Sequence, residues 1–100
     1  MRHAITLCLC AVLLGACASR PAAPQAAVAE LAPGGTLRAA INFGNPILAT
    51  KDPATGQPRG VSVDISRELA ARLGVNLELV PFEAAGKVVE AARSGAWDVA

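Results

Sequence analysis

The sequence predicts an α/β fold in which a parallel sheet is flanked by helices. Three short segments have the composition of strands, at residues 36–42, 75–80 and 96–100. The two segments between them, at residues 60–74 and 84–94, have the composition of helices. Strands and helices that alternate with short connections are typical of a parallel sheet covered by helices. Right-handed crossovers are the rule in such sheets, and they decide where both helices lie.

The composition of the 100 residues narrows the classes of function. The formal net charge is +1, from nine basic and eight acidic side chains. Arg2 lies in a segment that we expect to be removed, and without it eight basic side chains balance eight acidic ones. No basic face for nucleic acid is therefore expected. The only histidine, His3, and all three cysteines lie in the first seventeen residues. We therefore expect no metal, no cofactor and no histidine-based catalysis in residues 36–100.

The first seventeen residues have the pattern of an export signal. A short basic start is followed by an apolar run from Ala4 to Leu14, which is the length of a signal-peptide core rather than of a membrane-spanning helix. The run ends in Leu14-Gly15-Ala16-Cys17, which resembles a bacterial lipobox. This resemblance implies that residues 1–16 are a lipoprotein signal peptide and that Cys17 is lipidated, which anchors the exported protein to a membrane in the periplasm. The alternative is an ordinary signal peptide that is cleaved nearby.

Residues 17–35 are rich in alanine and proline. Pro21, Pro24 and Pro33 interrupt any helix that the alanines favour, so we expect a lipid-anchored tether in front of a domain over residues 36–100. Such a tether keeps the domain concentrated near the bilayer. A short helix over residues 25–31 is the alternative.

The predicted domain begins with a strand at residues 36–42, which follows a Pro-Gly-Gly turn and ends in polar residues. In the loop after it, Gly44 allows unusual backbone angles and Pro46 favours an extended Asn45. The sequence Asp-Pro-Ala-Thr-Gly at residues 52–56 contains two turn signals and predicts an exposed bend.

Residues 60–74 predict a surface helix with one buried face. An apolar side chain recurs every four residues and forms the predicted stripe, which consists of Val61, Ile65, Leu69 and Leu73. We expect this stripe to pack on the sheet. We expect Ser62 or Asp64 to cap the first turn and Gly74 to end the helix in the left-handed conformation.

Residues 75–80 alternate apolar and polar side chains and predict the second strand, which Pro81 closes. The next segment, residues 84–94, predicts a helix that places Val88 and Val89 on its buried side. Both connections are short, which again favours parallel strands joined by helices.

Residues 96–100 begin the third predicted strand. Trp97 is expected to pack between the sheet and a helix, because a large aromatic side chain is mostly buried. The neighbouring Asp98 has the side chain of a catalytic carboxylate, but its position at the start of a strand favours structural hydrogen bonds.

Two loops follow the carboxyl ends of the first and second predicted strands, at residues 42–46 and 81–86. Ligands of parallel sheets bind beyond these ends, where neighbouring connections diverge. The first loop holds Asn42 and Asn45, whose amides can donate to a carboxylate and accept from an ammonium group. The alternative for both asparagines is that they satisfy only the backbone of the turn.

Five stretches of the chain occur in one collinear order, and they are Leu37-Arg38, Thr55-Gly56, Gly60 to Ala70, Leu73-Gly74-Val75 and Gly95 to Val99. Together they resemble the extracytoplasmic solute-binding proteins of family 3, which are the substrate receptors of amino-acid ABC importers. The resemblance implies a two-lobed periplasmic-binding-protein fold of type II that closes on a small polar solute. Residues 36–100 are then the N-terminal part of lobe 1, and the rest of the fold is expected beyond Ala100.

The resemblance also implies which residues contact the solute. Asn42, Phe43 and Asn45 fall in the first ligand loop of the family, and Ala85 falls near the second. It implies a binding protein rather than an enzyme, which delivers an amino acid or a related small acid to the membrane subunits of an ABC importer and is a monomer at full length. Two alternatives remain on the same scaffold, namely a periplasmic enzyme (a dehydratase or a cell-wall lytic regulator) and a sensory ligand-binding module.

Overall fold

Two parallel strands form the centre of the computed structural model, which describes residues 19–100. These are β1 (Thr36–Asn42) and β4 (Asn76–Phe82), which pair along their whole length. Val99 adds an isolated parallel bridge to Ala39. The amide of Val99 donates to the carbonyl of Arg38 over 3.2 Å, at the edge of β1 that faces away from β4. The predicted α/β class with a parallel sheet is confirmed, and the third predicted strand is present as this bridge.

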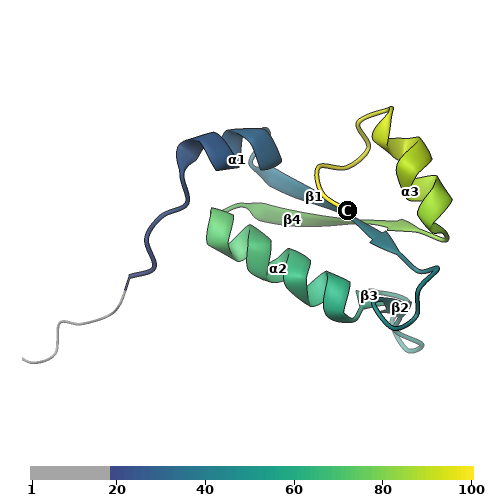
Figure 1. The fold of residues 1–100 in the computed structure, drawn as a ribbon. Coiled ribbons are helices and arrows are strands. Elements are labelled where there is room, and N and C mark those ends of the chain that lie inside the picture. The colour runs from purple at the N-terminus through teal and green to yellow at the C-terminus, as the bar shows by residue number, and fades with distance from the viewer. Residues whose placement is uncertain (1–18) are drawn as a thin grey trace, which may run out of the picture.

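Two helices cover the strands from opposite sides. Helix α2 (Val61–Leu73) leads to β4 and lies on one side of the pair, while α3 (Ala85–Ala92) leads from β4 to the Val99 bridge and lies on the other (Figure 1). Gly74 ends α2 with a φ of 70°, and its amide reaches the carbonyls of Ala70 and Ala71. The predicted left-handed stop is therefore confirmed, whereas no side chain caps the start of α2.

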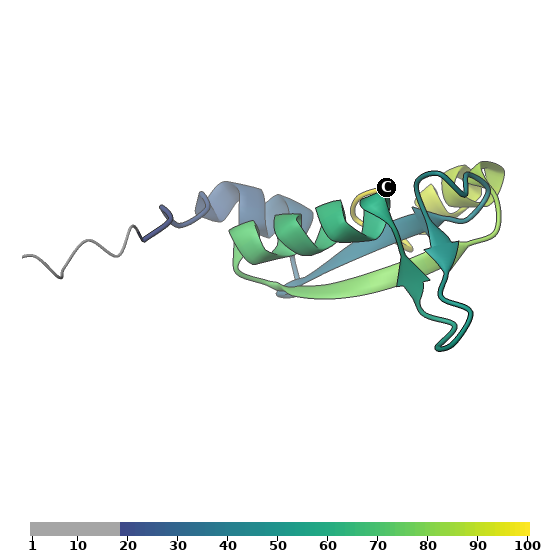
Figure 2. The ribbon, with the colours of Figure 1, turned by 90° about the horizontal axis from the view of Figure 1, so that it is seen from below.

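A small hairpin of β2 (Thr50–Lys51) and β3 (Pro58–Arg59) precedes α2 and projects from its first turn (Figure 2). Its tip is the predicted bend, where the carboxylate of Asp52 accepts hydrogen bonds from the amides of Ala54 and Thr55 over 2.8 and 3.1 Å. A short side-chain acceptor of this kind replaces the backbone partners that a tight turn leaves open.

The core consists of two clusters on the α2 side of the strands. Leu37 and Ile41 of β1 are fully buried, one in each cluster. Leu37 packs with Ala32 and Ala70, whereas Ile41 packs with Ala49 and Val63. The partly buried side chains around the two clusters are Leu31, Phe43, Leu69, Leu73, Val75, Leu77, Leu79 and Val99.

The buried face of α2 differs from the predicted stripe. The buried residues are Val63, Ser66 and Ala70, while Val61 is 52% and Ile65 is 63% exposed. Four residues turn a helix by about 40° more than one full turn, so a stripe at strict four-residue spacing drifts around the helix surface. Its first half leaves the sheet for this reason, whereas the second half, Leu69 and Leu73, stays partly buried. Ser66 can be buried although it is polar, because its hydroxyl donates a hydrogen bond to the carbonyl of Ser62 over 2.7 Å.

Helix α1 (Gln25–Leu31) occupies part of the segment predicted as a tether, so the alternative of a short helix is confirmed there. Ala32 directly after it is buried against Leu37. The role of residues 17–35 as a tether stays a prediction. No helix within residues 19–100 has the length and apolar character to cross a bilayer. The predicted signal peptide and Cys17 lie outside the described residues.

Two further predictions need correction. Strand β4 continues through Pro81 instead of ending before it. The carbonyl of Phe82 accepts a hydrogen bond from the amide of Phe43, so the backbone groups of Phe82 point toward β1. Neighbouring residues of a strand point their backbone groups to opposite edges. The nitrogen of Pro81 therefore faces the outer edge of the sheet, where no hydrogen bond of the strand pair is lost. On α3, Val88 is buried but Val89 is 69% exposed, because neighbouring residues on a helix point about 100° apart.

Candidate functional site

The two predicted ligand loops touch each other at the carboxyl ends of β1 and β4. The side-chain oxygen of Asn42 accepts a hydrogen bond from the amide of Gly44 over 2.8 Å. A β-carbon placed on Gly44 would lie 3.0 Å from that oxygen and 3.4 Å from the α-carbon of Ala84. Glycine at this position therefore lets the loop after β1 lie against the loop after β4.

Asn45, three residues after Asn42, also accepts a hydrogen bond from the backbone amide two residues later. Its side-chain oxygen accepts from the amide of Ile47 over 3.1 Å. Both asparagine oxygens thus satisfy the turn backbone, in line with one of the two alternatives for these residues. The nitrogen atoms of both side-chain amides are donors that these turns do not use. A contact of Asn42 or Asn45 with a ligand stays a prediction.

An ion pair lies beside these loops that the sequence did not predict. Lys51 of β2 places its ammonium nitrogen 2.7 Å from a carboxylate oxygen of Glu83, which follows β4. The same nitrogen lies 5.1 Å from the centre of the Phe43 ring, where a cation is attracted by the face of an aromatic side chain. Strand β2 is joined in this way to the connections after β1 and β4. Both charged side chains are largely exposed, so the pair orients groups more than it stabilises the fold.

A cavity of about 520 Å³ lies between α2 and α3, beside the edge of β1 that carries the Val99 bridge. It is lined by Ala39, Ala40, Asn42, Leu48, Ser62, Ile65, Ser66, Leu69, Ala85, Val88, Val89, Val99 and Ala100. Two of the predicted ligand residues, Asn42 and Ala85, therefore meet in one cavity. Phe43 and Asn45 do not line it.

The walls of this cavity carry exposed apolar side chains, and we call it the apolar groove. Leu48, Ile65 and Val89 line it, although each of them is exposed. Val61 lies one helical turn before Ile65, and Ile47 precedes Leu48 in the chain, and both are also exposed. The large apolar side chains that the described residues expose thus occur in one region.

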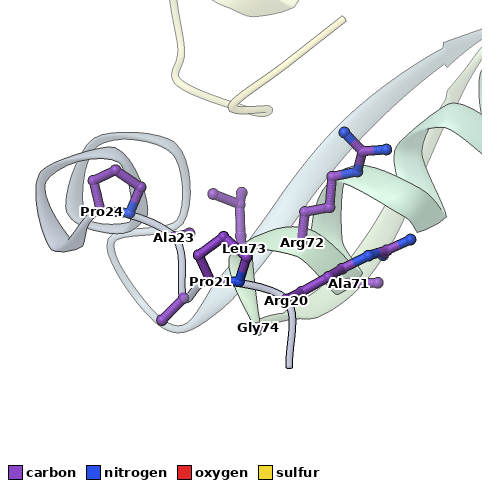
Figure 3. A pocket seen from close by; sticks show the side chains of 9 residues that line it. Arg20, Pro21, Ala23, Pro24, Ala71, Arg72, Leu73 and Gly74 are labelled. Carbon is purple, nitrogen blue, oxygen red and sulfur yellow. The ribbon is translucent and has the colours of Figure 1, made fainter. Parts of the chain in front are cut away.

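A second cavity of about 710 Å³ lies at the other end of the sheet (Figure 3). It is formed by residues 20–24 and by residues 71–74 at the end of α2. Arg20 points along its rim and pairs with Glu68 over 3.1 Å. This cavity is remote from the carboxyl ends of β1 and β4, so it is not our candidate for the solute site.

Asp98 has a structural role, as predicted, and its partner is Arg38. The carboxylate accepts from the Arg38 amide over 2.9 Å, from Nε over 3.1 Å and from Nη2 over 2.8 Å. The guanidinium also donates to the carbonyl of Gly95 over 2.7 Å. These side-chain hydrogen bonds lower the pKa of Asp98 and raise the pKa of Arg38. Trp97 next to it donates to the carbonyl of Val88 over 2.9 Å.

The ion pairs of Arg38 and Lys51 were not predicted from the sequence, because the partners are distant along the chain. Asp98 follows Arg38 by 60 residues, and Glu83 follows Lys51 by 32. One signal was available for Arg38, namely a charged side chain inside an apolar strand, which requires a partner when it is partly buried. No such signal marks Lys51. In the part of the chain that the structure describes, no three potential metal ligands come together.

Residues 37–100 match the family described as bacterial extracellular solute-binding proteins, family 3. The chain belongs to this family. The resemblance of the five collinear stretches is thereby confirmed at the level of the family. The matched residues include nearly all of β1, the other strands, helices α2 and α3, and the loops of the candidate site.

Two solved structures are similar to this family-3 chain. One is an ancestral cationic amino acid solute-binding protein, with 31% identity, a TM-score of 0.61 and coverage of 73% of this chain. The other is an ancestral cyclohexadienyl dehydratase, with 27% identity, a TM-score of 0.60 and coverage of 78%. This chain spans 31% of each of these structures. No curated protein matches the chain.

The two similar structures have different activities but nearly the same TM-score. The fold is therefore compatible with both binding and catalysis, and only the side chains of the site can distinguish them. Both structures also show that this part of the chain matches part of a periplasmic-binding-protein fold.

Proposed function

We propose that the protein binds a small polar solute outside the cytoplasm, an amino acid or a related small acid, and delivers it to the membrane subunits of an ABC importer. The match of residues 37–100 to the solute-binding family carries this proposal. In proteins of two lobes, closure around a ligand is a change that a partner can recognise. The described residues then form part of lobe 1, and the protein acts as a monomer.

The candidate contacts of the solute are Asn42, Phe43, Asn45 and Ala85. Asn42 and Ala85 line one cavity at the carboxyl end of the sheet, which supports a site there. The close approach of Gly44 to Ala84 brings the two loops together and supports a shared role. Phe43 contributes an aromatic ring whose face is next to a cation.

The protein is proposed to be anchored in the periplasm by a lipid on Cys17. The sequence Leu14-Gly15-Ala16-Cys17 supports this proposal, because small residues precede a cysteine after an apolar run. In this arrangement residues 1–16 are the signal peptide, residues 17–35 are the tether and residues 36–100 belong to lobe 1.

The proposed function is tested by calorimetry with the full-length protein and a panel of amino acids and small carboxylic acids. We expect at least one of them to bind, and we expect Asn42→Ala to weaken that binding. Asn76→Ala is the matched control, because Asn76 is an exposed asparagine at the opposite end of the sheet. A panel in which nothing binds would contradict the proposal.

A periplasmic dehydratase is the second candidate, since one similar structure is a cyclohexadienyl dehydratase. A dehydratase needs an acid or a base that can transfer a proton in the cleft. The described ligand loops hold one carboxylate, Glu83, and it is paired with Lys51. Binding is therefore favoured over catalysis. Turnover of a cyclohexadienyl acid to an aromatic product, followed by ultraviolet absorbance, would reverse this preference.

A further inference from the structure

We infer that the loop after β1 recognises an anionic group of the solute other than the carboxylate that all amino acids share, so that the protein prefers acidic solutes to cationic ones. This inference rests on the proposed function and specifies the class of solute. It differs from the ligand class named for one similar structure, which is described as a cationic amino acid solute-binding protein.

The oxygen atoms of both asparagine side chains are turned toward the backbone of their own loop, so the amide nitrogens are the atoms left to face a solute. The oxygen of Asn42 is used by the amide of Gly44, and the oxygen of Asn45 is used by the amide of Ile47. The amide hydrogens of a turn must face an oxygen, so these contacts also fix which way each side chain is turned. The amide nitrogens that remain can only donate hydrogen bonds. A carboxylate accepts such bonds, whereas an ammonium or guanidinium group cannot.

The charges beside the loop point in the same direction. A cationic solute needs a carboxylate that is free to pair with it. Glu83 is the one carboxylate within the two ligand loops, and Lys51 pairs with it over 2.7 Å. A cationic solute that paired with Glu83 would lie beside the ammonium group of Lys51 and would be repelled by it. An anionic solute meets no such repulsion from Lys51.

The neighbouring charges do not change this balance. On the hairpin, Asp52 pairs with Arg59 over 3.6 Å. On α3, Lys87 pairs with Glu90 over 2.9 Å. Each carboxylate near the two loops therefore has a basic partner in the structure, and Asn42 at the end of β1 is uncharged.

Asn42 is consequently the residue that distinguishes the two classes of solute. Asn42→Asp keeps the size of the side chain and an oxygen that can accept from the amide of Gly44. It replaces the donor nitrogen with an acceptor and adds a negative charge. A unit charge about 4 Å from a charged group of the solute changes the affinity by tenfold or more at the effective dielectric of a protein surface.

The inference is tested by calorimetry with the full-length protein against aspartate, glutamate, lysine and arginine. We expect an acidic amino acid to bind at least about tenfold more tightly than either basic one. We expect Asn42→Asp to weaken the acidic ligand by about tenfold or more and to improve the relative affinity for lysine or arginine. Asn76→Asp adds the same charge at the other end of the sheet and should leave the preference unchanged.

Tighter binding of lysine or arginine than of the acidic amino acids would overturn the inference but would support the proposed function. An acidic ligand that binds equally well to the wild type and to Asn42→Asp would also overturn it. Binding of none of the amino acids or small acids would instead contradict the proposed function itself. Circular dichroism of each variant shows whether the fold is kept, so that a lost affinity is assigned to the site.

Discussion

Replacing Asp98 with asparagine should weaken the attachment of residues 95–99 to β1. The carboxylate is 9% exposed and accepts three hydrogen bonds from Arg38, of which two come from the guanidinium. Asparagine retains one acceptor oxygen and loses the charge, so at least one donor of Arg38 is left without its partner. The segment that carries Val99 would then be held by fewer contacts.

The magnitude follows from these contacts. A hydrogen bond to a charged group contributes about 1.5 to 3 kcal/mol. Arg38 is 36% exposed, so water replaces part of what the guanidinium loses. We therefore expect Asp98→Asn to lower the free energy of unfolding by about 2 kcal/mol at neutral pH. Asp64→Asn is the matched control, because Asp64 is an exposed carboxylate with a longer ion pair of 3.4 Å to Arg67.

The pH dependence separates this mechanism from a general loss of packing. Arg38 lowers the pKa of Asp98, so the stabilisation is complete above the pKa of the unfolded chain, near 4, and is lost as the pH falls through the lower folded value. Urea unfolding of both proteins between pH 7 and pH 2 should therefore show a difference that is greatest at neutral pH and shrinks in acid. A difference that is independent of pH would refute the assignment.

Three further predictions concern other parts of the chain. Gly60→Ala should destabilise the protein in urea unfolding, because Gly60 has a φ of 123° and a β-carbon there would lie 2.6 Å from the carbonyl oxygen of Leu48; unchanged stability would contradict that geometry. Ile65→Asp should reduce the binding of a hydrophobic dye to residues 19–100 more than Ile47→Asp does, because Ile65 lines the apolar groove and Ile47 does not; equal effects would argue against the groove. Cys17→Ser should move the full-length protein from the membrane fraction to the soluble fraction or stall its processing, and unchanged fractionation would exclude the lipid anchor.

Strands β1 and β4 and helices α2 and α3 could be predicted because their signals are local, whereas the hairpin of β2 and β3 was expected only as a bend. Alternation of apolar side chains marked residues 75–80, and Gly74 marked the end of α2, which does not depend on the rest of the fold. The position of the ligand loops was also predictable, because parallel strands bring their carboxyl ends to one edge. The turn contacts of Asn42 and Asn45 are equally local, since each joins a side chain to an amide two residues later.

The pairs that fix the edges of the sheet could not be predicted in this way. The partner of Arg38 depends on the register between β1 and the segment after α3, and that register exists only in three dimensions. The contact between Lys51 and Glu83 depends on how the hairpin lies against the end of β4. Charged side chains of this kind carry no sequence pattern that identifies their partner.

Two of the three errors in predicted burial have one location. Ile65 on α2 and Val89 on α3 were predicted to be buried, as was Val61, and the first two line the apolar groove beside the edge of β1 that carries the Val99 bridge. Apolar periodicity indicates which side chains would lower the free energy by being buried, but it does not indicate which surface buries them. Exposed apolar side chains that gather in one region favour association with another surface. The sequence pattern therefore identifies side chains that gain from burial, whereas the helix geometry of α2 and α3 decides that Ile65 and Val89 face the groove.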